Sequence, residues 1–268
     1  MIPSVSQVCT LNSPFESDIE EFAEAGLRAI EIWLTKLEVY AAKKTPDEIK
    51  QLFADNSIRA SIASFQGGLL AAPSEKRNEA WSLFTERIAL CKKLGIETIV
   101  VACDVKMPFG DSDLQFVNEG LTEIAKVAER SDVRIAIEFQ SRSAFGNNLQ
   151  TAAALVEQAN SSHLGICFDA FHFYTGPSKE ADLAYLNQGN LFHVQLSDLI
   201  DVPRELATDS DRIVPGDGDF DLSTVIRHLR RIDYQGCVSM ELMNPRFWQI
   251  SPRQIGEIGV KAIQRLCE

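Results

Sequence analysis

The chain has 268 residues, of which 45% are hydrophobic and 24% are charged, and its formal net charge at pH 7 is −12. A chain this acidic, with no run of basic residues, is a poor partner for nucleic acid or an anionic membrane, because both need a basic face. Its N-terminal segment has neither the positive charges nor the long apolar stretch of a secretory signal, so we expect a cytoplasmic protein.

Short apolar runs rich in β-branched residues alternate with longer amphipathic stretches. This pattern predicts strands at residues 5–11, 29–33, 58–64, 98–102, 134–139, 164–169, 191–196 and 237–240. It predicts helices at residues 13–26, 45–56, 75–94, 114–131, 149–159, 179–186, 222–232 and 252–266, the sixth of which has a weak pattern.

Continuous apolar strands that alternate with helices are typical of a parallel sheet whose outer face is covered by those helices. Eight such units in about 250 residues match the size of a (β/α)8 barrel. We therefore predict a TIM barrel that spans residues 1–268 as a single domain. The structural alternative is an open, doubly wound sheet, but the segment TLNSPFES after the first strand lacks the glycine-rich phosphate turn of that fold.

Oxygen-bearing side chains stand at the C-terminal ends of the last four predicted strands. The segments IAIEFQ, CFDAFH, HVQLSD and SMELMN place Glu138, Asp169, Gln195 and Glu241 at these ends. Active sites of TIM barrels lie at this end of the strands. Consecutive strands are neighbours in a closed barrel, so we expect the four side chains to converge.

Three carboxylates and an amide cannot converge without compensation, because like charges repel. Asp169 also stands among aromatic residues in ICFDAFHFYTG, where an unpaired charge is costly. We predict that Glu138, Asp169, Gln195 and Glu241 bind one divalent ion. Oxygen ligands favour Mn²⁺ or Mg²⁺, with Co²⁺ and Zn²⁺ as further candidates. The simpler interpretation is that each group is a solvated or hydrogen-bonded strand end, and a barrel stabilised by buried ion pairs would need no metal.

Two histidines and an aspartate stand near the predicted ligands. His172 follows Asp169 by three residues, and it can orient that carboxylate, contact a substrate, or be an ordinary core histidine. His193 shares the face of Gln195 one layer deeper, so we expect it to support the ligands from behind or to be a structural histidine. Asp198, in the loop that follows, is a second candidate for such a supporting role.

Other strand ends and one loop offer candidates for binding a substrate. Trp33, Phe65 and Gln66 lie at the ends of the second and third strands, where an aromatic wall and an amide would suit a small polar ligand, although Trp and Phe are more often part of a core. Glu31 either lines the same rim or bonds the barrel backbone. Arg212 precedes the turn-rich segment VPGDGD and can reach an anionic oxygen of a substrate; pairing with Asp209 or Asp211 is the alternative.

In combination, these motifs resemble the xylose isomerase-like TIM barrels of the sugar phosphate isomerase/epimerase superfamily. The resemblance covers essentially the whole chain, and within that group it is strongest to the 2-keto-myo-inositol isomerases, or inosose isomerases. It is carried by IAIEFQ, CFDAFHFYTG, the spacing within SDLIDVPRELATDSDRIVPGDGDFDL, and VSMELMNPRFWQISP.

The resemblance implies metal ligands at Glu138, Asp169 and Glu241. The fourth ligand of the inosose isomerase pattern is usually a histidine, and Gln195 stands at that position here. Its segment HVQLSD is similar to hydroxypyruvate isomerases and to some 3-dehydroshikimate dehydratases, in which glutamine is a ligand. The resemblance also assigns substrate contacts to Arg212 and His172.

The implied activity is a divalent-metal-dependent isomerisation or epimerisation of a keto-sugar or keto-inositol. Glu138 and Glu241 would transfer the proton through an enediolate. The alternatives are dehydration of a 3-dehydroshikimate or inosose type of substrate, and a non-catalytic, metal-dependent sugar-binding barrel. No glycine-rich phosphate loop is apparent, so we expect an unphosphorylated keto-sugar or polyol. Phe-rich rim loops would suit a homodimer.

Overall fold

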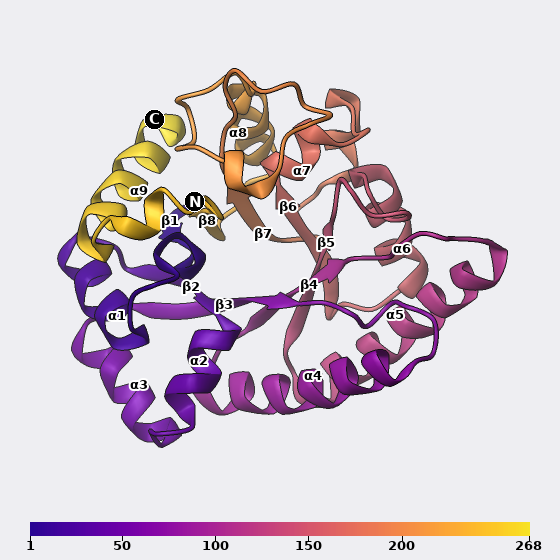
Figure 1. Ribbon diagram of the computed structural model, residues 1–268, viewed down its shortest axis with the longest axis horizontal. Helices are drawn as coiled ribbons and strands as arrows, with labels where there is room; N and C mark the ends of the chain where they lie inside the picture. The colour runs from indigo at the N-terminus through magenta and orange to yellow at the C-terminus, as the bar shows by residue number, and fades with distance from the viewer.

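The computed structural model describes residues 1–268 as a ring of eight parallel strands with helices around its outside (Figure 1). The strands are β1 (Ile2–Val5), β2 (Ala29–Trp33), β3 (Arg59–Gln66), β4 (Thr98–Cys103), β5 (Arg134–Phe139), β6 (Leu164–Asp169), β7 (Leu191–Leu196) and β8 (Cys237–Met240). They are hydrogen-bonded in the order β1-β8-β7-β6-β5-β4-β3-β2, and a parallel bridge between Ser6 and Glu31 joins the two ends of the sheet. The predicted (β/α)8 barrel is therefore confirmed, and the open sheet is excluded.

The helices follow the strands and begin and end at residues suited to those positions. They are α1 (Phe15–Glu24), α2 (Leu34–Ala41), α3 (Pro46–Asp55), α4 (Glu75–Leu94), α5 (Asp111–Ser131), α6 (Leu149–Ala159), α7 (Ala170–Thr175), α8 (Leu222–Arg231) and α9 (Pro252–Cys267). Thr45 and Glu48 form a capping box at the start of α3, and Gly95 ends α4 in the left-handed conformation at φ 76°. No helix is both long and apolar enough to span a membrane.

The structure differs from the predicted elements mainly in short segments. The first strand ends at Val5, not residue 11, because the chain turns at Ser6 into the 3-10 helix η1 (Gln7–Thr10), whose Val8 amide faces the Ser6 hydroxyl. The short helices α2 and α7 were not predicted, and the weak helix predicted at 179–186 is the 3-10 helix η2 (Glu180–Tyr185). Two further 3-10 turns are η3 (Asp209–Asp211) and η4 (Phe247–Gln249).

The core has two layers, one between the strands and the helices and one inside the barrel. The inner layer is a cluster of seven buried residues from seven strands: Ala29, Ile62, Val100, Ala136, Cys167, Phe192 and Cys237. Side chains alternate between the two faces of a strand, so the residue two positions further along points into the barrel as well. This alternation places Glu31, Glu138 and Asp169 above the inner layer, at the C-terminal end of the barrel.

Candidate active site

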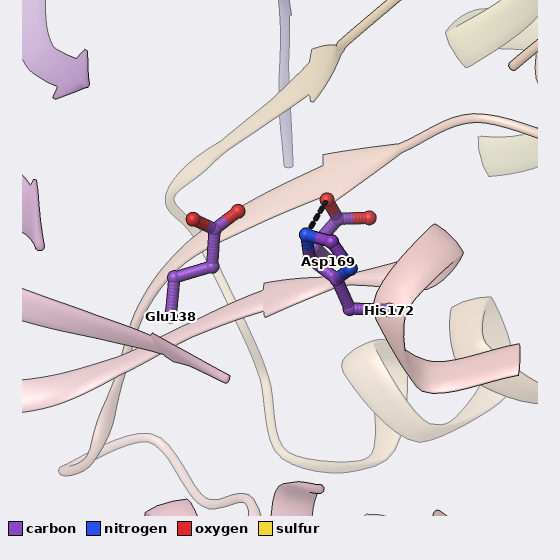
Figure 2. Close-up of side chains that lie close together, drawn as sticks. All are labelled: Glu138, Asp169 and His172. Carbon is purple, nitrogen blue, oxygen red and sulfur yellow. Dashed lines mark ion pairs between the residues drawn. The ribbon is translucent and has the colours of Figure 1, made fainter. Parts of the chain in front are cut away.

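Two carboxylates and an imidazole meet at the C-terminal ends of β5 and β6. Glu138 comes from β5, Asp169 is the last residue of β6, and His172 lies on α7. One ligand atom of each residue lies within 4.8 Å of the others, and all three side chains are buried. Figure 2 shows the carboxylates of Glu138 and Asp169 side by side, with the His172 ring next to Asp169. The predicted convergence of the strand ends is thus observed for β5 and β6.

The backbone after β6 fixes the positions of Asp169 and His172. The Phe171 amide donates a hydrogen bond of 2.6 Å to Asp169 Oδ1, so Asp169 caps the N-terminus of α7. This short helix then brings His172 Nε2 to 3.8 Å from Asp169 Oδ2. The other ring nitrogen, Nδ1, lies 3.2 Å from the Ser141 hydroxyl. A single turn of helix therefore places both groups at the site.

Arg212 is the counter-charge of the site, although it comes from the loop between β7 and α8. Its Nη2 lies 2.8 Å from Asp169 Oδ2, and its Nη1 donates a hydrogen bond of 3.1 Å to Glu241 Oε2. Its Nε donates to Asp209 Oδ1 at 2.9 Å, and the guanidinium carbon lies 4.4 Å from the centroid of the Phe171 ring. Only 1% of Arg212 is exposed, so this cation acts in a medium that screens it weakly.

The loop that carries Arg212 is held by Asp198. Asp198 Oδ1 accepts hydrogen bonds from the amides of Leu199 and Phe220, both at 2.9 Å, and Oδ2 accepts one from the Gly216 amide at 3.0 Å. A pair of backbone hydrogen bonds joins Asp198 to Ile213, next to Arg212. The carboxylate therefore organises the loop, and its hydrogen bonds go to backbone amides, not to the predicted ligands.

Gln195 links Glu241 to a second buried carboxylate, Glu31 on β2, which in turn contacts His193 on β7. Its Nε2 donates to Glu241 Oε1 and to Glu31 Oε1, each at 2.8 Å, and its Oε1 accepts a hydrogen bond from the Cys167 thiol at 3.0 Å. His193 Nε2 lies 2.8 Å from Glu31 Oε2. His193 thus supports Gln195 through Glu31, and Glu31 bonds side chains, not the barrel backbone.

Burial dominates the acid–base properties of the two glutamates. It raises the pKa of Glu138 well above its usual range, and the nearby charge of Asp169 adds to the effect. Burial likewise raises the pKa of Glu241, where Arg212 opposes the shift and the charge of Glu31 adds to it. Both carboxyl groups therefore hold a proton readily as long as no further positive charge enters the site.

The pKa values of Asp169 and His172 are shifted downwards in the same environment. Burial is the largest single influence and acts to raise the pKa of Asp169, but Arg212, His172 and the Phe171 amide together outweigh it, so this pKa lies below its ordinary value. Burial lowers the pKa of His172, which leaves a neutral imidazole near neutral pH. The site therefore combines one firmly ionised carboxylate, two glutamates that gain or lose a proton, and a neutral ring.

A cavity of about 440 Å³ connects these groups to the surface. Glu138, His172, Gln195, Arg212 and Glu241 line it, together with the predicted substrate-binding residues Trp33 and Gln66 and further residues that include Phe65, Arg87, Gln140 and Asp209. Sequence reasoning did not single out Gln140, whose Nε2 donates a hydrogen bond of 2.6 Å to Glu138 Oε2. The sequence signal for Gln140 was its position two residues after Glu138, just after the end of the same strand.

The donors around this cavity fit a divalent cation. Glu138 and Asp169 offer carboxylate oxygens, and neutral His172 offers a nitrogen, within 4.8 Å of one another. Glu241 lines the same cavity but is not part of this close group, because its oxygens contact Gln195 and Arg212. Asp169 Oδ2 is fully buried and accepts no well-directed hydrogen bond, although Arg212 Nη2 lies 2.8 Å away. Gln195 directs its Nε2 to Glu241, so ligation through Oε1 requires its amide to turn over.

Comparison with known proteins agrees with the fold. A family model described as xylose isomerase-like TIM barrel matches residues 19–266. The chain is 28% identical to the inosose isomerase of Halalkalibacterium halodurans over 93% of this chain and 90% of that protein. It is also 23% identical to the 3-dehydroshikimate dehydratase of Pseudomonas putida, over 97% of this chain and 41% of that protein.

A solved structure shows the same architecture over its full length. The 1.8 Å crystal structure of the IOLI protein with a bound zinc atom covers 100% of this chain, and the match extends over 98% of that protein. The TM-score is 0.92 and the sequence identity is 25%.

Proposed function

The chain belongs to the xylose isomerase-like TIM barrel family, and we propose that it is a divalent-metal-dependent isomerase or epimerase of a keto-inositol or keto-sugar. The observation that carries this proposal is that Glu138, Glu241 and Arg212 line one cavity at the C-terminal end of the barrel, with Asp169 buried against Arg212. The similarity to an inosose isomerase over most of both chains supports the same substrate class.

Four residues would hold the metal: Glu138, Asp169, Gln195 and Glu241. We propose Mn²⁺ or Mg²⁺, because three carboxylates and an amide are hard ligands, while zinc is the ion bound by the structurally similar IOLI protein. The bound ion would supply Lewis-acid polarisation of the substrate carbonyl and charge that favours the ionised glutamates. His172 is close enough to Glu138 and Asp169 to be a further donor.

Glu138 and Glu241 are the groups that would move the proton. Glu138 accepts a hydrogen bond from Gln140 at Oε2 and none at Oε1, which leaves one oxygen free to take a proton from a substrate carbon. Both oxygens of Glu241 are occupied, by Gln195 and by Arg212. We therefore assign the first proton abstraction to Glu138 and the return of a proton to Glu241.

Arg212 and His172 would stabilise the enediolate that proton abstraction produces. Arg212 is fixed by three carboxylates, so its charge needs no rearrangement as an oxyanion forms. His172 is neutral and its Nε2 lies 3.5 Å from Arg212 Nη2, while its Nδ1 is held by Ser141. It can therefore donate or accept at a substrate hydroxyl without a change in charge.

Dehydration is the second candidate activity. The residue at the fourth ligand position is Gln195, as in the dehydratase-like motif, and the chain is similar to a 3-dehydroshikimate dehydratase. Both reactions begin with removal of a proton next to a carbonyl, but dehydration then expels a hydroxyl and isomerisation returns the proton.

One panel of substrates separates these activities. The protein loaded with Mn²⁺ is incubated in D₂O with keto-inositols, ketoses and 3-dehydroshikimate. Deuterium uptake into carbon, with conservation of all hydroxyl groups, identifies the isomerase. Loss of water identifies the dehydratase, through a new enone absorbance from a keto-inositol or a new aromatic absorbance from 3-dehydroshikimate. A non-catalytic sugar-binding barrel would bind ligand without either change, and Glu138→Gln would leave its affinity unaltered. The homodimer and the cytoplasmic location stay predictions.

A further inference from the structure

Phe65, on the rim of the cavity, has a backbone conformation that is unusual for its residue type. Its φ is 83°, in the region that favours glycine. The other non-glycine residues with positive φ are Ser57, Asp132, Asn160, Asp201 and Asp233, all short and polar. Strain of this kind in a bulky residue persists only where its surroundings enforce it, and it often marks a functional site.

The strain coincides with a β-bulge in β3. Ala63 pairs with Ile99 and Gln66 pairs with Val101, so three steps along β3 oppose two along β4. In one common type of bulge the residue with positive φ is a glycine, and such bulges next to active sites redirect a side chain. Here Phe65 takes the glycine position, and Gln66, the next residue, lines the cavity.

Arg87 holds this segment in place from α4. Its Nη1 donates hydrogen bonds to the Phe65 carbonyl at 2.7 Å and to Gln66 Oε1 at 3.1 Å. The rest of the guanidinium makes a two-pronged contact with Glu38 on α2, with distances of 2.5 and 3.0 Å. The Arg87 side chain is only 6% exposed, so both of its partners matter for its position.

The same segment builds an aromatic wall at the mouth of the cavity. The Phe65 ring stacks on the Trp33 indole with 4.1 Å between centroids and an angle of 24° between planes. Trp33 is buried, whereas 54% of Phe65 is exposed, and both line the cavity that holds Glu138 and Arg212. A large aromatic residue exposed next to a polar site, in a strained conformation, has no role in the core.

We propose that Arg87, fixed by Glu38, is a positioning residue that holds Phe65 and Gln66 as a recognition wall for the ring of a cyclic polyol. The C–H face of such a ring would pack on the exposed aromatic pair, and the Gln66 amide would meet its hydroxyl groups. This inference rests on the proposed function, because it names the ring face that the same cavity recognises. It assigns the wall to binding and leaves the proton transfer to the glutamates.

Substitutions separate the wall from the clamp that holds it. Arg87→Met removes the clamp and keeps an unbranched apolar stem, while Phe65→Ala removes the ring and keeps the unfavourable φ. Phe65→Gly also removes the ring but suits the backbone. The matched control is Arg59→Met, on β3, the strand that carries Phe65. It removes a surface arginine whose Nη2 lies 2.6 Å from Glu97 Oε1.

Two readouts are measured for each variant. The first is acrylamide quenching of Trp33, with Trp81 and Trp248 replaced by Phe so that one of the three tryptophans remains. The second is steady-state turnover of 2-keto-myo-inositol with Mn²⁺. We expect Arg87→Met to raise the quenching constant about twofold or more and to raise KM about tenfold with kcat nearly unchanged, the pattern of lost uniform binding. Phe65→Ala and Phe65→Gly should both raise KM, and Arg59→Met should change neither readout.

The proposal is overturned if Arg87→Met leaves quenching and KM at parental values, or if both Phe65 variants keep the parental KM. If the parent turns over no keto-inositol or ketose, the proposed function fails, but the quenching of Trp33 still decides whether Arg87 holds the wall. Calorimetric titration with myo-inositol then tests the wall itself. The wall is contradicted if the parent binds no myo-inositol, or if Phe65→Ala binds it with the parental affinity.

Discussion

Arg212 and Asp169 form an ion pair at the C-terminal end of the barrel, with Nη2 and Oδ2 2.8 Å apart and both side chains almost fully buried. The same guanidinium reaches Glu241, so one cation from a loop balances carboxylates from two strands. A divalent ion at these carboxylates would share this role with Arg212. The balance of charge between Arg212, the carboxylates and the ion should therefore affect stability, its dependence on pH and the preference among metals.

Replacing Arg212 should make the stability of the protein depend on metal. Arg212→Met leaves Asp169 and Glu241 without their counter-charge, and breaking a buried ion pair in this way costs roughly 3–5 kcal/mol. We expect a large fall in the free energy of unfolding in the presence of a chelator and a partial recovery with Mn²⁺. Urea unfolding with and without Mn²⁺ measures both, with the exposed Arg253→Met as control. Equal losses in both conditions would contradict the shared role.

Removing the charge of Glu138 should abolish proton transfer while the fold is kept. Glu138→Gln keeps the size of the side chain but cannot accept a proton, and loss of a general base typically costs about 10²–10⁴-fold in rate. The measurement is deuterium incorporation from D₂O into the substrate, with circular dichroism to verify folding. Glu157→Gln, on the exposed face of α6, is the matched control. Parental exchange in Glu138→Gln would exclude this residue as the base.

The stabilisation by metal should increase with pH. Burial raises the pKa of Glu138 and Glu241 above the ordinary carboxyl value of 4.5, so the metal-free fold keeps protons that the unfolded chain has lost. Stability from these groups is fully present below that ordinary value, and it is lost as pH rises through their raised pKa in the folded state. A metal needs the ionised forms, so the gain in Tm from Mn²⁺ should grow as pH rises through the raised pKa of these two groups. A gain that is constant or falls would show that metal binding does not displace these protons.

Gln195 should set the preference of the site among metals. Gln195→His introduces a softer nitrogen ligand, which should raise affinity for Zn²⁺ relative to Mn²⁺. Gln195→Leu removes the donor shared by Glu31 and Glu241, and it should weaken Mn²⁺ binding about tenfold or more. Calorimetric titration with each metal gives both ratios. If Gln195→Leu binds Mn²⁺ as the parent does, the amide does not contribute to the metal site.

The sequence predicted the regular parts of the barrel well because their patterns are strong. Strands β5 to β8 and helices α4 and α6 have the predicted bounds, since the helices are followed by Gly95 and Asn160 and the apolar runs of the strands end at polar or charged residues. The apolar pattern continues past Val5, so the turn at Ser6 could not be predicted from it. Helix α7 is rich in aromatic residues, which favour strands. The feature that favours a helix here is the Asp169 side chain, which caps the helix by accepting a hydrogen bond from the Phe171 amide.

For the site, the positions of Glu138, Asp169, Gln195 and Glu241 at the ends of consecutive strands were enough to predict that all four lie at one end of the barrel. The partner of Asp169 could not be predicted in the same way, because Arg212 reaches it from a loop whose path depends on the backbone contacts of Asp198. The sequence did place Trp33, Phe65 and Gln66 at neighbouring strand ends. The strained backbone of Phe65 could not be predicted, since a positive φ leaves no trace in the residue pattern.

The most direct test of the central claim is a calorimetric titration of the metal-free protein with Mn²⁺ near neutral pH. If the last four strand ends share one ion, the protein binds a single Mn²⁺ per chain, and Asp169→Asn and Glu241→Gln each weaken that binding strongly. A protein that binds no ion, or binds one with an affinity that neither substitution alters, would contradict the account.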